Sequence, residues 1–305
     1  MFKNLSSKQL GLSGSQSELI ELALSFGFKG LDLDIVEFAE QVASKGLPHA
    51  RRLLDSSKLQ VGAFALPTRW QGDDETFKED LAKVPTWAAV AGEAGYRRAV
   101  TVIDPASDER PFHQNFELAK RRLNDLGKAL EPHGIRLGVG FSADASLRKD
   151  RSFEFIHGLD TLLLLFSSVS ARNVGMVVDL FDLHVAGGSI EDLRKVGAAR
   201  LVGVLLADAP TETPAQQCLP AQRLLPGETG AIDSTAALVL LAELGYDGPV
   251  TPTAHPDQLK GLRREAAVKR VGEAMDRVWK AAGLNALGKL SSLGKLASPA
   301  KSMKS

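Results

Sequence analysis

Short apolar segments alternate with longer segments of mixed character along most of the chain. Some apolar segments are almost continuous, such as 174–180 and 201–207, which is typical of parallel strands that are buried on both faces. We predict strands at 9–12, 30–35, 59–66, 97–103, 135–141, 174–180, 201–207 and 249–253. The segments between them follow a helical pattern, and we predict helices at 17–26, 36–55, 76–94, 114–133, 152–170, 190–196 and 234–244, with a last helix at 256–282.

Glycines mark the points where predicted helices end and strands begin. Phe26-Gly27-Phe28 and Leu244-Gly245-Tyr246 follow one pattern, in which glycine adopts the left-handed conformation and the next side chain packs back onto the helix. Short links between alternating helices and strands indicate a parallel sheet. Repetition of this unit along the whole chain favours closure into a (β/α)8 TIM barrel, which is an α/β fold. An open doubly wound sheet is the alternative, but no Gly-x-Gly-x-x-Gly follows the first predicted strand.

Composition narrows the classes of function. The 305 residues include 37 basic and 37 acidic side chains, so the basic excess expected of a nucleic-acid-binding protein is missing. The first residues are too polar for a signal peptide, and the most apolar run, 162–166, is too short to cross a membrane. The single cysteine, Cys218, has no partner for an internal disulfide, which favours a cytoplasmic location. We predict one domain at 1–282 and a flexible tail rich in Lys and Ser at 283–305.

Polar side chains gather where the predicted strands end. TIM-barrel enzymes carry their active sites at the C-terminal ends of the strands, so these side chains are the candidates for chemistry. In chain order they are Asp32, Asp34, Arg69, Trp70, Asp104, Ser142, Asp144, Asp179, Asp182, His184, Asp208, Thr253 and His255. The predicted barrel mouth is therefore rich in carboxylates and holds two histidines.

Motifs in the second half of the chain carry a resemblance to a known family. They are the segment 179–188, which begins Asp179-Leu180-Phe181-Asp182, the strand-like segment 201–210, the loop Leu225-Pro226-Gly227-Glu228, and the segment 249–253. In this order they resemble the sixth strand, the seventh strand, the loop before the seventh helix and the last strand of the xylose-isomerase-like sugar isomerases and epimerases. The segment 104–117 is also similar to members of that family, and the likeness extends to about Ala282.

The resemblance implies a divalent metal site. Members of the family hold the metal with two glutamates, an aspartate and a histidine, one from each of the last four strands. The metal acts as a Lewis acid on a ketose, and the glutamates move a proton through an enediolate. Carried over, the aspartate is Asp179, and a second family histidine falls on Asp182. The other three ligand positions fall on Gly140, Leu205 and Thr253.

These substitutions change what the resemblance implies about metal. Glycine and leucine offer no ligand atom to a hard cation, and threonine is a poor substitute for a carboxylate. We therefore expect a divalent ion such as Mn²⁺ or Mg²⁺ to bind only weakly, and no other cofactor.

Three functions remain open. In the first, the barrel binds a small polar molecule such as a sugar without turnover, using some of Arg69, Trp70, Asp104, Asp208, Glu228 and His255. In the second, it is an active sugar isomerase or epimerase with a relocated catalytic site made of Asp179, Asp182 and His184. In the third, it is a non-enzymatic interaction protein. We expect no nucleic-acid or membrane partner, and the sequence leaves the oligomeric state open.

Overall fold

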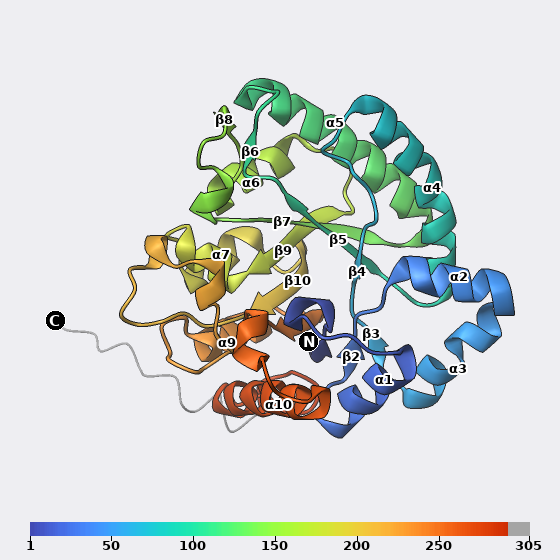
Figure 1. Ribbon diagram of the computed structural model, residues 1–305, viewed down its shortest axis with the longest axis vertical. Coiled ribbons are helices and arrows are strands. Elements are labelled where there is room, and N and C mark those ends of the chain that lie inside the picture. The colour runs from blue at the N-terminus through green and yellow to red at the C-terminus, as the bar shows by residue number, and fades with distance from the viewer. Residues whose placement is uncertain (292–305) are drawn as a thin grey trace.

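A barrel of parallel strands surrounded by helices forms the body of the molecule (Figure 1). The computed structural model describes residues 1–291. The hydrogen-bonded order of the strands is β3-β2-β1-β11-β10-β9-β7-β5-β4, and every pair in it is parallel. The two end strands, β3 and β4, are separated by residues 62 and 63 alone and are two halves of one strand position. The sheet therefore closes on itself, which confirms the predicted TIM barrel.

The barrel strands are β1 (Phe2–Leu5), β2 (Gly30–Leu31), β3 (Gln60–Val61), β4 (Phe64–Ala65), β5 (Arg98–Ile103), β7 (Arg136–Phe141), β9 (Val174–Asp179), β10 (Leu201–Leu206) and β11 (Pro249–Pro252). Two further strands, β6 (Ala106–Ser107) and β8 (Phe153–Glu154), form an antiparallel pair outside the barrel.

The α-helices are α1 (Gln16–Ser25), α2 (Ile35–Lys45), α3 (Leu47–Ser57), α4 (Asp74–Glu93), α5 (Phe112–Leu130), α6 (Leu159–Ser168), α7 (Leu180–Val185), α8 (Leu193–Val196), α9 (Ser234–Glu243) and α10 (Arg264–Ala281). Short 3₁₀ helices are η1 (Lys8–Leu10), η2 (Glu131–His133), η3 (Ala145–Leu147), η4 (Ile190–Asp192), η5 (Ala215–Gln217), η6 (Pro220–Gln222) and η7 (Pro256–Leu259).

The first strand differs from the prediction at 9–12. It is β1 (Phe2–Leu5), and η1 covers residues 9 and 10 of the predicted segment. The reason is Asn4, a polar side chain that is fully buried inside the barrel. Its amide nitrogen donates to Asp32 Oδ1 at 2.8 Å and to Thr251 Oγ1 at 2.9 Å. Because a buried polar residue interrupts the apolar pattern, β1 does not read as a core strand in the sequence.

Several predicted boundaries also move. The strand predicted at 30–35 ends at Leu31, because the Asp34 side chain caps α2 by accepting from the amides of Val36 and Glu37. The helix predicted at 36–55 is interrupted at Gly46, whose φ of +81° favours glycine, and continues as α3. The helices predicted at 152–170 and 256–282 begin later, as α6 and α10, after β8 and η7 respectively.

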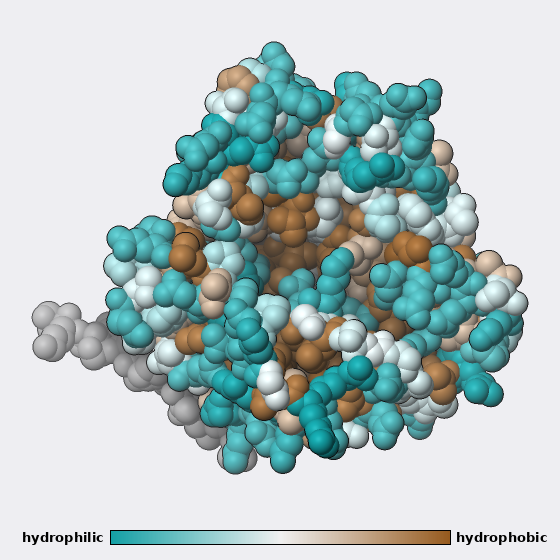
Figure 2. All heavy atoms as spheres, in the orientation of Figure 1, coloured by the Kyte–Doolittle hydropathy of each residue, from teal (hydrophilic) through white to brown (hydrophobic). Residues whose placement is uncertain are grey.

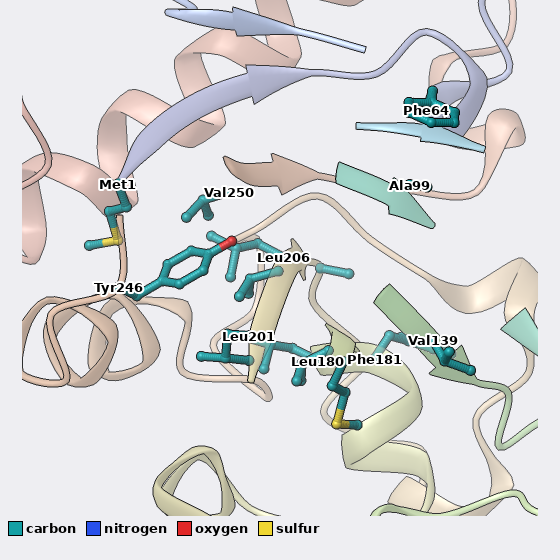
Figure 3. Close-up of a cluster of buried hydrophobic side chains, with 14 of the residues drawn as sticks. Met1, Phe64, Ala99, Val139, Leu180, Phe181, Leu201, Leu206, Tyr246 and Val250 are labelled. Carbon is teal, nitrogen blue, oxygen red and sulfur yellow. The ribbon is translucent and has the colours of Figure 1, made fainter. Parts of the chain in front are cut away.

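The core fills the space between the barrel wall and the helices. Figure 3 shows part of it, including Leu201 and Leu206 of β10 and Leu180 and Phe181 at the start of α7. These four side chains are at most 2 % exposed. Close packing at this point fixes the position of α7 relative to β10, and α7 begins at the end of β9, where the candidate site lies.

The segment after α10 folds back instead of leaving the molecule, and Gly288 lies against Met1, just before β1. Leu284 and Leu290 form a β-bridge, and Trp279 Nε1 donates to the Asn285 carbonyl at 3.0 Å. Residues 283–291 therefore differ from the predicted flexible tail, while 292–305 lie outside the described residues. None of the helices within residues 1–291 is long and apolar enough to span a membrane.

Candidate functional site

Four strand positions border one region of the barrel mouth: Gly140 of β7, Asp179 of β9, Leu205 of β10, and Thr253 directly after β11. Their strands are adjacent, because β9 pairs with β7 and β10, and β10 pairs with β11. Asp179 and Leu205 are direct partners across the β9–β10 pair, and the Thr253 amide donates to the Leu206 carbonyl at 2.7 Å. Of the four positions, Asp179 alone carries a carboxylate.

The guanidinium of Arg223 joins this region together. Nη1 donates to the Asp179 carboxylate and to Thr253 Oγ1 at 3.1 Å, and Nη2 donates to Asp182 Oδ2 at 3.2 Å. The guanidinium carbon lies 4.6 Å from the centroid of the Phe181 ring, a cation–π contact. The Arg223 side chain is 16 % exposed and both aspartates are 13 % exposed, so the ion pairs are mostly shielded from water. We refer to Arg223, Asp179 and Asp182 as the mouth cluster.

Both aspartates also hold the local backbone. Asp179 caps the short helix α7 by accepting from the amides of Phe181 and Asp182, at 2.9 and 3.4 Å. Asp182 accepts from the Ala143 amide at 2.8 Å and so fixes the loop after β7 to α7. The sequence pattern Asp-x-x-Asp after a strand therefore positions two carboxylates on one side of the mouth.

In the mouth cluster one cation faces two carboxylates. Burial, and next the charge of Asp179, raise the pKa of Asp182 to about 7, against the opposing effects of Arg223 and the Ala143 amide. Burial alone would lower the pKa of Arg223, but the two aspartates outweigh it and the pKa rises. Arg223 is therefore a permanent cation, whereas Asp182 changes its charge near neutral pH.

The loop between β10 and α9 delivers Arg223, and Asp208 stabilises that loop. The Asp208 carboxylate is fully buried and accepts from the amides of Ala209, Thr229, Gly230 and Ile232, at 2.8–2.9 Å. Its backbone forms a two-way bridge with Leu224, and the Arg223 carbonyl accepts from the His255 amide at 2.9 Å. Because the buried carboxylate accepts all four of these amide hydrogen bonds, Asp208 is not free to bind a substrate, contrary to the sequence prediction.

Arg223 was not among the residues predicted from the sequence. One signal was available, because Arg223 is the single basic residue between Asp208 and Gly230 and stands directly before the Leu224-Leu225-Pro226-Gly227 segment. Its partner Asp179, however, lies 44 residues away in the sequence. Nothing in the local pattern indicates that pairing.

Three other predicted substrate contacts are engaged elsewhere. Trp70 is 2 % exposed and its Nε1 donates to Thr101 Oγ1 at 2.9 Å, so its ring has no face to stack on a sugar. Arg69 forms a bidentate pair with Asp80, at 2.9 Å for both contacts. Glu228 Oε1 accepts from Arg270 of α10 at 2.7 Å.

The remaining candidates lie apart from the mouth cluster. His255 caps η7 by accepting from the Asp257 amide at 3.3 Å. Asp104 is exposed and lines a polar cleft of about 180 Å³ with Gln71 and Arg151 among other residues. His184 lines a different cleft, of about 240 Å³, and burial lowers its pKa. The structure thus brings Asp179 and Asp182 together, but leaves His184 outside their cluster.

The mouth also has an apolar side. Figure 2 shows a hollow in the middle of the viewed face, lined by hydrophobic residues and encircled by hydrophilic ones. Val102, the strand partner of Gly140, is 56 % exposed although it belongs to β5. A Cβ atom at residue 140 would come no nearer than 3.5 Å to a neighbouring atom, so it would fit here in ordinary van der Waals contact. An apolar wall beside a few convergent polar groups is typical of small-molecule sites.

The donor atoms at the mouth do not fit a divalent metal. Within residues 1–291, no group of three or more His, Cys, Asp or Glu side chains is arranged to hold a metal ion. Asp179 and Asp182 are bonded to a guanidinium, and Thr253 Oγ1 accepts from the same group. Mn²⁺ and Mg²⁺ are bound through free carboxylate oxygens and waters, whereas both carboxylates here are already engaged by the guanidinium.

Comparison with known proteins agrees with the fold. The model of the family described as "Xylose isomerase-like TIM barrel" matches residues 20–278 of this chain. The chain belongs to this family. Its curated relatives include an inosose isomerase of Halalkalibacterium halodurans, 25 % identical over 147 residues, which are 48 % of this chain and 49 % of the relative. An inosose isomerase of Bacillus licheniformis is 26 % identical over 151 residues, 50 % of this chain and 51 % of the relative. The chain thus spans about half the length of the curated relatives that it matches.

Solved structures resemble the whole barrel. A xylose isomerase domain protein from Alicyclobacillus acidocaldarius has a TM-score of 0.82 at 23 % identity, over 92 % of this chain and 98 % of that chain. The IOLI protein, described with a bound zinc atom, has a TM-score of 0.76 at 18 % identity, over 93 % and 98 % of the two chains. A D-psicose 3-epimerase solved in the presence of D-fructose has a TM-score of 0.71 at 12 % identity, over 93 % and 100 %. At these identities the likeness shows the fold.

Proposed function

We propose that the chain binds a small sugar-like molecule, a polyol or a ketose, at the barrel mouth without metal-dependent turnover. The observation that carries this proposal is the mouth cluster, in which a guanidinium and two carboxylates meet beside an apolar wall. Hydroxyl groups both donate and accept hydrogen bonds, so a ligand rich in hydroxyls can use the guanidinium and the carboxylates together. The relatives named as inosose isomerases and a D-psicose 3-epimerase support a ligand of this class.

The side chains at the mouth argue against isomerisation through an enediolate. That reaction needs positioned groups that remove and return a proton at neighbouring carbons. The resemblance assigns this role to glutamates at positions that Gly140 and Thr253 occupy in this chain, and neither side chain ionises. Binding should therefore be measurable, while turnover by this route should be absent.

Calorimetric titration with a panel of ketohexoses, inososes and cyclitols tests the proposal. We expect saturable binding to the wild type and binding at least about tenfold weaker to Arg223→Met, because that variant removes the central donor of the cluster. Arg69→Met is the matched control, since its guanidinium pairs with Asp80 outside the cluster. Absence of binding for every sugar and cyclitol in the panel would refute the proposal.

A metal-free sugar isomerase is the second candidate, and one observation favours it. Asp182 has a pKa of about 7 and lies beside a guanidinium, so it combines a proton-transfer group with a group that polarises a carbonyl. This is the predicted relocated site without His184. Isomerisation that persists in EDTA and disappears in Asp182→Asn would favour this candidate over binding without turnover.

A further inference from the structure

The positive charge at the barrel mouth is carried by a side chain of the protein itself, Arg223. Arg223 reaches the end of β9 through Asp179, the first turn of α7 through Asp182, and the end of β11 through Thr253. Two of these three contacts, Asp179 and Thr253, are positions where the resemblance places metal ligands. A single guanidinium therefore bridges the elements that a metal ion would otherwise join.

We propose that Arg223 takes the place of a divalent cation, so that the mouth keeps its structure and its positive charge without metal. This inference goes beyond the ligand proposed above, because it concerns the cation and holds whichever small molecule binds.

Displacement of Arg223 by a metal ion would be unfavourable. A metal that bound Asp179, Asp182 and Thr253 would break all three bonds from Arg223, and it would leave a largely buried guanidinium without its counter-ions. Removing one partner from a buried ion pair is strongly destabilising, because the remaining charge is uncompensated.

The position of Arg223 is fixed by the fold. Its carbonyl accepts from the His255 amide, and the next residue, Leu224, exchanges two backbone hydrogen bonds with Asp208, each at 2.9 Å. The Phe181 ring supports one face of the guanidinium. Because the backbone on one side and an aromatic ring on the other hold the side chain, the charge stays at a defined place, as a coordinated ion would.

Part of the guanidinium remains available to a ligand. Arg223 Nη1 uses both hydrogens, on Asp179 and Thr253, and Nη2 uses one, on Asp182. Within residues 1–291, Nε–H and the second Nη2–H have no hydrogen-bond partner. A planar guanidinium offers such hydrogens side by side, which suits two neighbouring oxygens of a diol or a hydroxyketone. In this arrangement the guanidinium would contact the same oxygen pair that a metal would chelate.

Titration with Mn²⁺ tests the proposal on the folded protein, with metal binding and melting temperature as readouts. The proteins are the wild type, Arg223→Gln and Arg69→Gln, all treated with EDTA and dialysed. Arg69→Gln is the matched control, because it also removes a guanidinium from a shielded aspartate but exposes one carboxylate, Asp80, instead of two. Bound Mn²⁺ is measured by electron paramagnetic resonance, and melting temperature is measured with and without Mn²⁺.

We expect no saturable Mn²⁺ binding in the wild type or in Arg69→Gln. Arg223→Gln should have a lower melting temperature in EDTA and regain about 2 °C or more with Mn²⁺, because the ion restores the missing charge. If Arg223→Gln does not fold in EDTA, refolding that succeeds with Mn²⁺ alone gives the same support. Saturable Mn²⁺ binding by the wild type, or no effect of Mn²⁺ on the stability or refolding of Arg223→Gln, would overturn the proposal.

Discussion

Replacement of Asp182 by asparagine should change how stability depends on pH. The folded protein holds the Asp182 carboxyl with a pKa of about 7, raised from the usual 3.8 by burial and by Asp179. A raised folded pKa means that the folded state binds the proton more tightly than the unfolded state. The stabilisation that comes from this tighter proton binding is fully present below about pH 4, declines as the pH rises through about 7, and is absent above that value. Asparagine has the same shape but cannot ionise.

The size of the effect follows from the shift in pKa. A change of about three pKa units at roughly 1.4 kcal/mol per unit amounts to about 4 kcal/mol over the full titration. Between pH 5 and pH 8 the free energy of unfolding of the wild type should therefore fall by about 3 kcal/mol relative to Asp182→Asn. The difference should grow steadily up to about pH 7 and then level off.

Urea unfolding followed by tryptophan fluorescence at pH 5, 6, 7 and 8 measures this difference. Asp55→Asn is the control, because that carboxylate is 56 % exposed in a surface pair with Arg51 and its variant should parallel the wild type. A difference between wild type and Asp182→Asn that stays constant over this range would refute the reasoning. Asp182 would then not change its charge in the folded protein over this pH range.

Three further substitutions test how the loops around the mouth are held. Arg122→Met should destabilise the fold by about 2–4 kcal/mol in urea unfolding, because the fully buried guanidinium donates at 2.7 Å to the carbonyls of Trp70 and Gly72 and its removal leaves both acceptors unpaired. Trp70→Phe should cost about 1 kcal/mol, through the bond to Thr101, and leave calorimetric sugar affinity unchanged because the ring is 2 % exposed. Asp80→Asn should be less stable than the wild type above about pH 4, and this difference should disappear as the pH falls from 4 to 2. The reason is that Arg69 lowers the pKa of Asp80 to about 2, so the ionised carboxylate stabilises the wild type only above that range. A difference that stays constant in acid denaturation would contradict this.

The fold could be predicted because apolar periodicity and helix-ending glycines act locally. Strands such as β7, β9 and β10 lie within a residue or two of their predicted positions, since nearly every side chain in them is apolar. Strand β1 could not be predicted in the same way. Its buried Asn4 is stabilised by Asp32 and by Thr251, and the second of these is 247 residues away. A polar residue becomes compatible with a core strand only through such distant partners.

The candidate site was predictable in part for the same physical reason. The spacing of Asp179 and Asp182 places both at the start of one short helix, so their proximity follows from local structure. A predicted position at the mouth was not enough to distinguish side chains that can bind a ligand from side chains that hold a loop in place. Asp208 and Asp104 both follow strands, but four backbone amides engage the first, while the second is exposed to a cleft. Which role a carboxylate has depends on the path of the loop after it.

An aspartate at a metal-ligand position is therefore weak support for metal binding in this barrel. Asp179 has two other functions that each account for its presence: it caps α7 and it is the counter-ion of Arg223. Substituting Asp179 would remove both, so a loss of stability or ligand binding in such a variant would say nothing about a metal. The informative change is at Arg223, because only its removal frees both carboxylates while the cap of α7 remains. Substitution of Arg223, and not of Asp179, is therefore the change that tests which cation the mouth holds.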